Sequence, residues 1–203
     1  MPEEKRTELG SLGEFELINR LVEGFETVNE STVKSIGDDA AVIEYKEGQI
    51  VVSTDLLIEN IHFDLMYTPL KHLGYKAVVV NLSDIYAMNA IPEQITVSIG
   101  VSNRFSLESL DELYDGIKAA CKHYKVDLVG GDTSSSNKGL IISVTAIGRA
   151  LKEDIVYRNT AQPGDLICVT GDLGAAFIGI QILEREKALF LDNPGIKPEL
   201  ADN

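Results

Sequence analysis

The sequence predicts an α+β fold in which a mixed or antiparallel sheet is covered by helices. Segments with the two-residue alternation of strands, such as 93–101, are interleaved with segments whose apolar residues recur every three or four positions, such as 107–121. Of the 203 residues, 44% are hydrophobic and 25% are charged, which is typical of a globular protein with a real core. We predict a first domain over residues 1–150 and the incomplete beginning of a second, α/β domain over residues 151–203.

The N-terminal elements are predicted from caps and alternation. Ser11 and Glu14 have the spacing of a capping box, so the first helix should begin near Ser11. The segments AAVIEY and QIVVSTD alternate on either side of the turn KEG, which predicts a hairpin. Thr68 and Pro69 then open a helix that contains the apolar run KAVVVNLSDIYAM.

The later elements follow the same logic. EQITVSIGV alternates as a strand, and Ser106 caps a helix whose apolar stripe ends at Cys121. VDLVGG and GLIISVTAIGRA are predicted strands. Beyond Arg149, LICVTG is a predicted strand and residues 174–190 a predicted helix. One strand and one helix cannot close a core of their own.

Charge and composition exclude several classes of partner. Thirty-two acidic and 18 basic residues give a formal charge of −14, which repels both nucleic acid and an anionic membrane. The N-terminus does not resemble a signal peptide, and no apolar run reaches membrane-spanning length. We therefore expect a cytoplasmic protein without a nucleic acid or membrane partner. Cys121 and Cys168 lie in apolar segments and are predicted to be buried free thiols.

Five acidic clusters lie where an ordinary core would not place a charge. They are Asp38 with Asp39, Asp55 beside Ser53 and Thr54, Asp84 within a predicted helix, Asp132 after Gly130 and Gly131, and Asp172. A carboxylate buried without a partner is costly, and Lys and Arg are sparse in these segments, so bound metal is one way to stabilise them. Magnesium prefers such oxygen ligands together with substrate phosphates. Each cluster is also typical of an ordinary turn or cap, so their convergence is a hypothesis.

The remaining chemistry-bearing residues are few. His62 follows the Asp55 cluster, but a lone histidine without ligand spacing is as typical of a surface position. Neither a GxxxxGK[ST] phosphate loop nor a GxGxxG fingerprint occurs. A nucleotide would therefore have to be held through metal ions and glycine turns.

Six ordered segments together resemble the thiamine-monophosphate kinase family. They are GEFELI, IGDDAAV, STDLLIENIHF, YKAVVVNLSDIYAMNA, LVGGDTS and YRNTAQPGDLICVTGDLG. The superfamily also contains aminoimidazole ribonucleotide synthetase and selenophosphate synthetase. The resemblance implies an ATP-binding N-terminal domain of the aminoimidazole ribonucleotide synthetase type, and direct transfer of a phosphoryl group from ATP to thiamine monophosphate without a catalytic side-chain nucleophile.

The resemblance also implies roles for individual residues. Several Mg²⁺ ions would be held by Asp39, Ser53, Thr54, Asp55, Asp84 and Asp132. ATP would be contacted by Tyr114, Gly131, Asp132 and Arg158, and the substrate by His62. The first domain would pair with a second copy as a β-barrel homodimer. No role is assigned to Asp38 or Asp172.

The chain departs from the family in two ways. A further aspartate-rich motif and an aromatic residue follow in the family but are absent here, so we expect a truncated form with weak or no kinase activity alone. Asn89 stands where relatives often have glycine. Two alternatives stay open: another ATP-using synthetase of the superfamily, or a non-catalytic nucleotide-binding or dimerisation fragment. A reactive cysteine near the N-terminus, expected of selenophosphate synthetases, is absent before Cys121.

Overall fold

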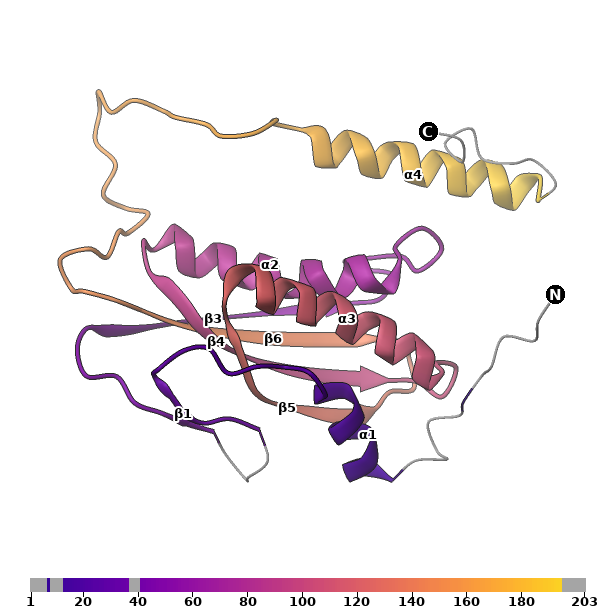
Figure 1. Ribbon diagram of the computed structural model, residues 1–203. Coiled ribbons are helices and arrows are strands. Elements are labelled where there is room, and N and C mark those ends of the chain that lie inside the picture. The colour runs from indigo at the N-terminus through magenta and orange to yellow at the C-terminus, as the bar shows by residue number, and fades with distance from the viewer. Residues whose placement is uncertain (1–6, 8–12, 37–40, 195–203) are drawn as a thin grey trace. The chain divides into compact units, whose positions relative to one another are not determined.

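A computed structural model describes residue 7 and residues 13–36 and 41–194. The chain divides into two compact units, Met1–Arg158 and Asn159–Asn203. In the first unit two helices lie side by side over a four-stranded sheet (Figure 1). The elements of the first unit are α1 (Glu14–Val22), β1 (Thr32–Lys34), β2 (Val42–Ile43), β3 (Gln49–Ile58), α2 (Leu70–Ala87), β4 (Ile91–Val101), α3 (Leu107–Tyr124), β5 (Asp127–Ser135) and β6 (Ile141–Ala150). The predicted α+β class is confirmed.

The main sheet has the strand order β3-β6-β4-β5. β6 pairs antiparallel with both β3 and β4, whereas β4 and β5 are parallel and are connected through α3. β3 and β5 therefore form opposite edges, although both run in the same direction. A separate small sheet pairs β1 with β2.

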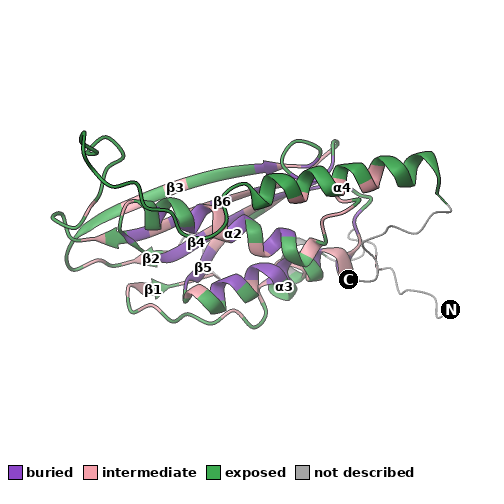
Figure 2. Cartoon of the chain, turned by 90° about the horizontal axis from the view of Figure 1, so that it is seen from above, coloured by how far each residue is buried: buried purple, intermediate pink, exposed green. Residues whose placement is uncertain are grey.

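One face of the main sheet is buried beneath the helices. Along β6, Ile142, Val144 and Ala146 are buried, and a Cβ at Gly148 would lie 2.6 Å from Cγ2 of Ile85 on α2. Figure 2 shows the buried residues concentrated in α2, α3 and the central strands. The opposite face, which we call the open face, carries residues from the alternate positions of each strand.

The two covering helices cross at glycines. A Cβ at Gly74 of α2 would lie 2.0 Å from the Leu113 carbonyl oxygen, and one at Gly116 of α3 would lie 1.9 Å from that of Lys71. Only residues without a side chain allow the two backbones to approach so closely.

The start of α3 agrees with the helix start predicted from the sequence, since the Ser106 hydroxyl accepts the Ser109 N–H at 3.3 Å.

Three local predictions are wrong or fall outside the described residues. The predicted hairpin does not form, because β3 pairs along its whole length with β6, whereas the two-residue β2 pairs with β1. α1 begins at Glu14 after Gly13, and Ser11 lies outside the described residues. The thiol of Cys121 is buried as predicted, but Cys168 is exposed.

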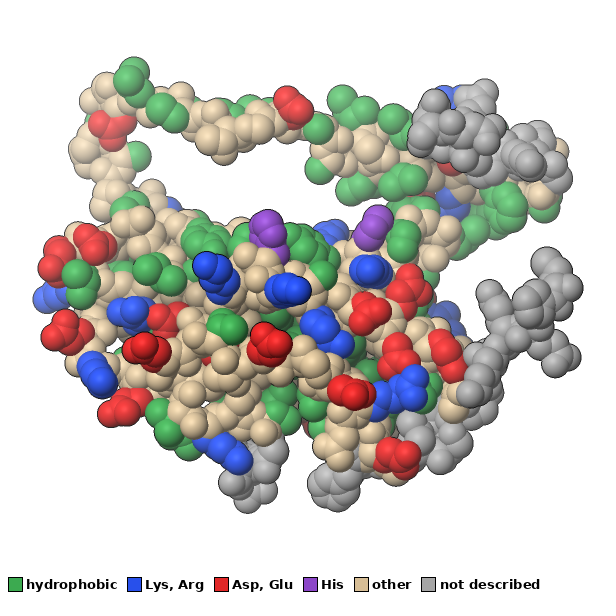
Figure 3. All heavy atoms as spheres, in the orientation of Figure 1, with side chains coloured by type: hydrophobic (Ala, Val, Ile, Leu, Met, Phe, Trp, Pro, Cys, Tyr) green, Lys and Arg blue, Asp and Glu red, His purple; other side chains and the backbone are tan. Residues whose placement is uncertain are grey.

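The second unit contains one helix, α4 (Ala175–Asp192), among its described residues. The predicted helix is therefore confirmed. The predicted strand LICVTG is absent because these residues have no partner strand, and Leu166 and Ile167 are 89% and 95% exposed. None of the α4 residues is buried, and Figure 3 shows hydrophobic side chains along its visible face. Across both units, the described helices include none with the length and apolarity needed to span a bilayer. The predicted domain boundary at residue 150 stays a prediction.

Candidate metal site

The centre of the candidate site is a contact between β3 and α2. Ser53 donates a hydrogen bond from Oγ to Oδ2 of Asp84 at 2.6 Å. Ser53 and Asp55 pair with Ala146 and Val144 of β6, whose side chains lie beneath the helices. Because alternate strand residues share a face, Asp55 lies on the same side of the sheet, about 7 Å along β3. The structure therefore brings Ser53, Asp55 and Asp84 to one edge of the sheet.

The three aspartates expected to be buried are exposed. Asp55, Asp84 and Asp132 are all accessible to solvent, so the argument from the cost of burying their charge is wrong for this chain. Asp84 is exposed because it lies at the rim of α2 beside the edge strand β3. Its neighbour Ile85, by contrast, is fully buried against the sheet. Helical spacing in the sequence places Asp84 on the same face as apolar residues, but it could not show which part of α2 extends beyond the edge of the sheet.

The donor set at this edge suits a hydrated Mg²⁺ ion. It offers two carboxylates and a hydroxyl, all of them oxygen ligands, and Mg²⁺ commonly takes one or two carboxylates with water and phosphate oxygens. Within residues 13–36 and 41–194, no cluster of three or more His, Cys, Asp or Glu is arranged to hold a metal. A cation here would thus depend on water and a polyphosphate ligand for the rest of its coordination. Asp38 and Asp39 lie outside the described residues.

Two other predicted metal ligands lie elsewhere on the sheet. Thr54 faces the open face, where its hydroxyl donates to the Val144 carbonyl and accepts from Thr145, both at 3.1 Å. Asp132 is on β5, the opposite edge strand, and accepts a hydrogen bond from Ser134 at 3.1 Å. Its register partner is Ser98, which places it on the open face. Three strand spacings, about 14 Å, separate its strand from that of Asp55.

The predicted nucleotide contacts are also dispersed. A Cβ at Gly131 would lie 1.9 Å from the Val97 carbonyl oxygen, so this glycine permits a close approach of β5 to β4. Tyr114 is buried on α3, and burial raises its pKa to about 12. It lies in a hollow of about 460 Å³ whose walls include Arg20 and Lys118. Arg158 is exposed at the end of the first unit.

His62 lies in the turn after β3 and is exposed. Its Nδ1 accepts the Ile58 backbone N–H at 3.0 Å. The ring is thus oriented by its own turn. Asp172 lies in the second unit, and its role stays open.

Among the described residues, the carboxylates that are buried are others than those predicted from the sequence. Asp127 is fully buried and accepts hydrogen bonds from the N–H groups of Val28 and Asn29 at 2.7 and 3.1 Å and from Thr32 Oγ1 at 2.6 Å. Glu93 accepts from Arg149 at 2.5 Å. Asp127 thus fixes the N-terminal segment to β5, whereas the Glu93–Arg149 hydrogen bond joins β4 to β6. The acidic residue within the apolar run YKVDLVGG was the available signal for Asp127.

Comparison with known proteins decides the family. Residues 37–150 match the family described as AIR synthase related protein, N-terminal domain. The chain belongs to this family. Among curated relatives, thiamine-monophosphate kinase of Bacillus subtilis is 38% identical to this chain over 177 residues. These residues cover 86% of this chain and 54% of the relative. The chain therefore spans about half the length of the curated relatives it matches.

Solved structures agree in fold. Thiamine-monophosphate kinase from Stenotrophomonas maltophilia K279a is 33% identical with a TM-score of 0.73, covering 86% of this chain and 54% of that one. The structure described as AaThiL complexed with AMPPCP and TMP is also 33% identical, with a TM-score of 0.65, covering 90% and 56%. The predicted resemblance to thiamine-monophosphate kinase is confirmed.

Proposed function

We propose that this AIR synthase related chain is the N-terminal part of an enzyme that transfers a phosphoryl group from ATP to thiamine monophosphate, giving thiamine diphosphate. The observation that carries the proposal is the Ser53–Asp84 hydrogen bond with Asp55 on the same face. This oxygen-rich edge occurs in a chain 33% identical to a protein solved with AMPPCP and TMP.

The chemistry of this reaction suits such a site. The acceptor is a phosphate monoester that is already largely ionised near neutral pH, so the main barrier is the approach of two polyanions. Positioning and neutralisation of charge then supply most of the catalysis. Asp55 and Asp84 would hold Mg²⁺, and Ser53 orients the Asp84 carboxylate. Mg²⁺ held there would supply positive charge that offsets the charge of the phosphate groups.

The remaining site residues are assigned as part of the same proposal. Asp39, Thr54 and Asp132 would complete the set of Mg²⁺ ligands. Tyr114, Gly131, Asp132 and Arg158 would contact ATP, and His62 would contact thiamine monophosphate through its solvent-facing side. In the described chain Asp132 lies at the opposite edge from Asp55. Within one copy of this chain, the proposed Mg²⁺ ligands therefore do not all lie together. The complete site would need further protein, either a second copy or the rest of a longer chain.

We further propose that the first unit forms a homodimer through the open face. Ile50, Val52, Leu56 and Ile91 occupy this face, and each is between 48% and 61% exposed. Several large apolar side chains exposed on one face of a sheet are typical of a protein interface. Asp132 lies on the same face, so the second copy would approach it.

Full activity belongs to the longer protein under this proposal. The chain covers 54% of the length of its Bacillus relative, and none of the α4 residues is buried. We expect weak or no turnover from the chain alone, and a cytoplasmic location where ATP and Mg²⁺ are abundant. The same observations favour a second candidate, a nucleotide-binding and dimerisation module without catalysis.

Thermal unfolding with ligands tests the proposal. A ligand that binds only the folded state raises Tm. We expect Mg²⁺ with AMPPCP to raise the Tm of the chain, and thiamine monophosphate to add to that shift. Stabilisation without turnover favours the binding module for this chain. Failure of Mg²⁺ and AMPPCP to shift Tm would contradict the proposed nucleotide site.

A further inference from the structure

The C-terminal end of α2 holds the segment that leads out of the first unit. We call residues 151–158 the linker. Asn89, just after α2, donates a hydrogen bond from Nδ2 to the backbone carbonyl of Asp154 at 2.8 Å. One residue earlier, the Met88 carbonyl accepts the Val156 N–H at 3.1 Å. Two adjacent residues at one helix end thus fix the linker at two points.

The backbone at Asn89 explains why this residue type occurs there. Its φ is 56°, in the left-handed region that favours glycine and that asparagine also tolerates. Its N–H closes the helix end on the Tyr86 carbonyl at 2.9 Å. A glycine would satisfy the same backbone geometry but has no side-chain amide that could donate a hydrogen bond to Asp154. Asparagine therefore adds to the helix end a hydrogen bond that glycine cannot make.

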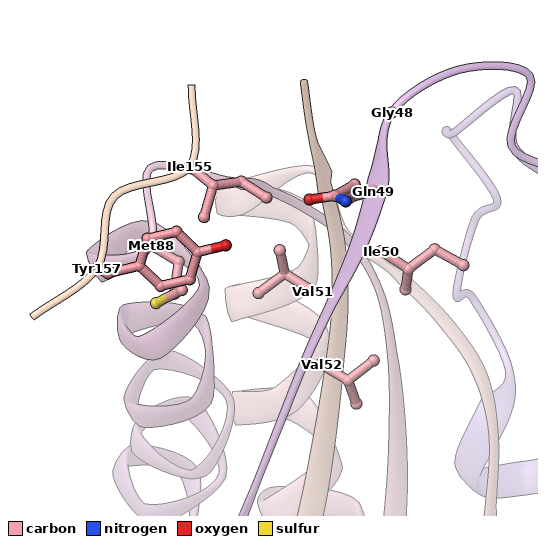
Figure 4. A pocket seen from close by; sticks show the side chains of 8 residues that line it. All are labelled: Gly48, Gln49, Ile50, Val51, Val52, Met88, Ile155 and Tyr157. Atoms are coloured by element: carbon pink, nitrogen blue, oxygen red, sulfur yellow. The ribbon is translucent and has the colours of Figure 1, made fainter. Parts of the chain in front are cut away.

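The fixed linker forms one wall of a hollow. Ile155 and Tyr157 line a space of about 700 Å³ together with Met88 and residues 48–52. In Figure 4 the side chains of Met88, Val51 and Tyr157 lie toward this space, whereas Ile50 and Val52 point away. Arg158 follows Tyr157 directly and lies two residues beyond the backbone bond at Val156.

We propose that Asn89 is a positioning residue that fixes the linker and so holds Tyr157 and Arg158 in place for the phosphate-bearing nucleotide. This inference rests on the proposed function, because Arg158 is there assigned to ATP. Its physical basis is preorganisation: a segment that is already ordered loses less conformational freedom when a ligand binds. This positioning role of Asn89 requires neither the Asp55–Asp84 edge nor a direct contact between Asn89 and the ligand.

The test is hydrogen exchange across the linker in the Asn89→Gly variant. This change keeps the left-handed backbone and removes only the side-chain hydrogen bond. Loss of one such bond predicts about fivefold faster exchange of amides in residues 154–158. Exchange in β4 and β6 should stay unchanged. Calorimetry should show affinity for Mg²⁺ with AMPPCP falling by about the same factor.

Lys125→Gly is the matched control. Lys125 also has a φ of 56° at a helix end, but it lies at the end of α3, away from the linker. It should leave linker exchange and nucleotide affinity unchanged. Equal linker exchange in Asn89→Gly and the wild type would overturn the inference. Faster exchange with unchanged affinity would overturn the positioning role.

The design separates this inference from the proposed function. If the wild-type chain does not bind Mg²⁺ with AMPPCP, the proposed nucleotide site fails, and the nucleotide role of Asn89 fails with it. Exchange in the free protein still decides whether Asn89 fixes the linker.

Discussion

At the scale of single residues, the Ser53 hydroxyl holds the Asp84 carboxylate at the sheet edge, and Asp55 lies on the same face. The sequence singled out these three residues because oxygen donors recur beside apolar runs, and their role as metal ligands stays a prediction. It placed these charges in the core, whereas the structure places them at the rim. Among the residues that the structure describes, the buried acids are instead Glu59, Glu93 and Asp127, which have hydrogen-bond partners from distant segments. Such partners cannot be read from local sequence.

The two cysteines give a prediction at this scale. Burial, together with the nearby charge of Asp127, raises the pKa of the Cys121 thiol to about 12, so little reactive thiolate forms near neutral pH. Cys168 is exposed. At pH 8 a thiol reagent should label one cysteine per native chain and both after unfolding. In Cys168→Ser the native reaction should disappear. Rapid labelling of native Cys168→Ser would contradict this packing.

At the scale of elements, long periodic segments were predictable and their pairing was not. The amphipathic stripe of α3 and the alternation of β4 and β6 are local signals, and the structure confirms them. The partner of β3 is β6, about 90 residues away, and no local pattern distinguishes it from the neighbouring β2. The glycine crossing of α2 and α3 is likewise visible only once the helices are packed.

The helix crossing gives a stability prediction. In Gly116→Ala the new methyl would lie 1.9 Å from the Lys71 carbonyl oxygen, which forces the helices apart. We expect the free energy of unfolding to fall by about 3 kcal/mol, despite the better helix propensity of alanine. Urea unfolding monitored by circular dichroism measures it.

Gly179→Ala in α4 is the control for this substitution. No atom lies within 4 Å of its added Cβ, so it should not destabilise the protein. Equal stability of Gly116→Ala and wild type would show that the two helices do not pack as closely as described.

The start of α3 gives a pH prediction. The Thr7 hydroxyl donates to Glu108 at 2.7 Å and its N–H at 3.1 Å, and these bonds lower the pKa of Glu108 from 4.5 to about 2. A lowered folded-state pKa stabilises the fold above pH 4.5, and this stabilisation is lost as pH falls toward 2. The difference in unfolding midpoint between wild type and Glu108→Gln should therefore shrink between pH 5 and pH 2.5.

The control for the pH experiment is Glu112→Gln, an exposed position one turn further along α3. The difference in unfolding midpoint between Glu112→Gln and wild type should be small at both pH 5 and pH 2.5. If the difference in unfolding midpoint between Glu108→Gln and wild type grows as the pH is lowered, the contact between Thr7 and Glu108 would be contradicted.

At the scale of the whole molecule, both units leave apolar side chains uncovered among their described residues. The open face and α4 both expose large hydrophobic side chains. The sequence predicted one strand and one helix within residues 151–203, too few elements to form a core, and an incomplete second domain stays a prediction. It did not indicate which face of the main sheet is open, since that depends on where α2 and α3 pack.

The open face gives a prediction about assembly. Val52 is 60% exposed on it, and Val52→Glu places a charge where the second copy should pack. Sedimentation should show a dimer for wild type and a monomer for the variant. Val28→Glu, at a position 56% exposed and off the main sheet, should stay dimeric. A monomeric wild type at high protein concentration would contradict the proposed interface.

We propose that the edge formed by Ser53, Asp55 and Asp84 holds Mg²⁺ for a polyphosphate. Calorimetric titration of Mg²⁺ with AMPPCP into wild type, Asp84→Asn and Glu112→Gln tests this binding. Asparagine at position 84 keeps the acceptor for Ser53 but removes the charge, while Glu112 is an exposed acidic residue of α3 away from this edge. We predict binding in wild type and Glu112→Gln, and at least tenfold weaker binding in Asp84→Asn at unchanged Tm. Equal affinity in all three proteins would contradict the account.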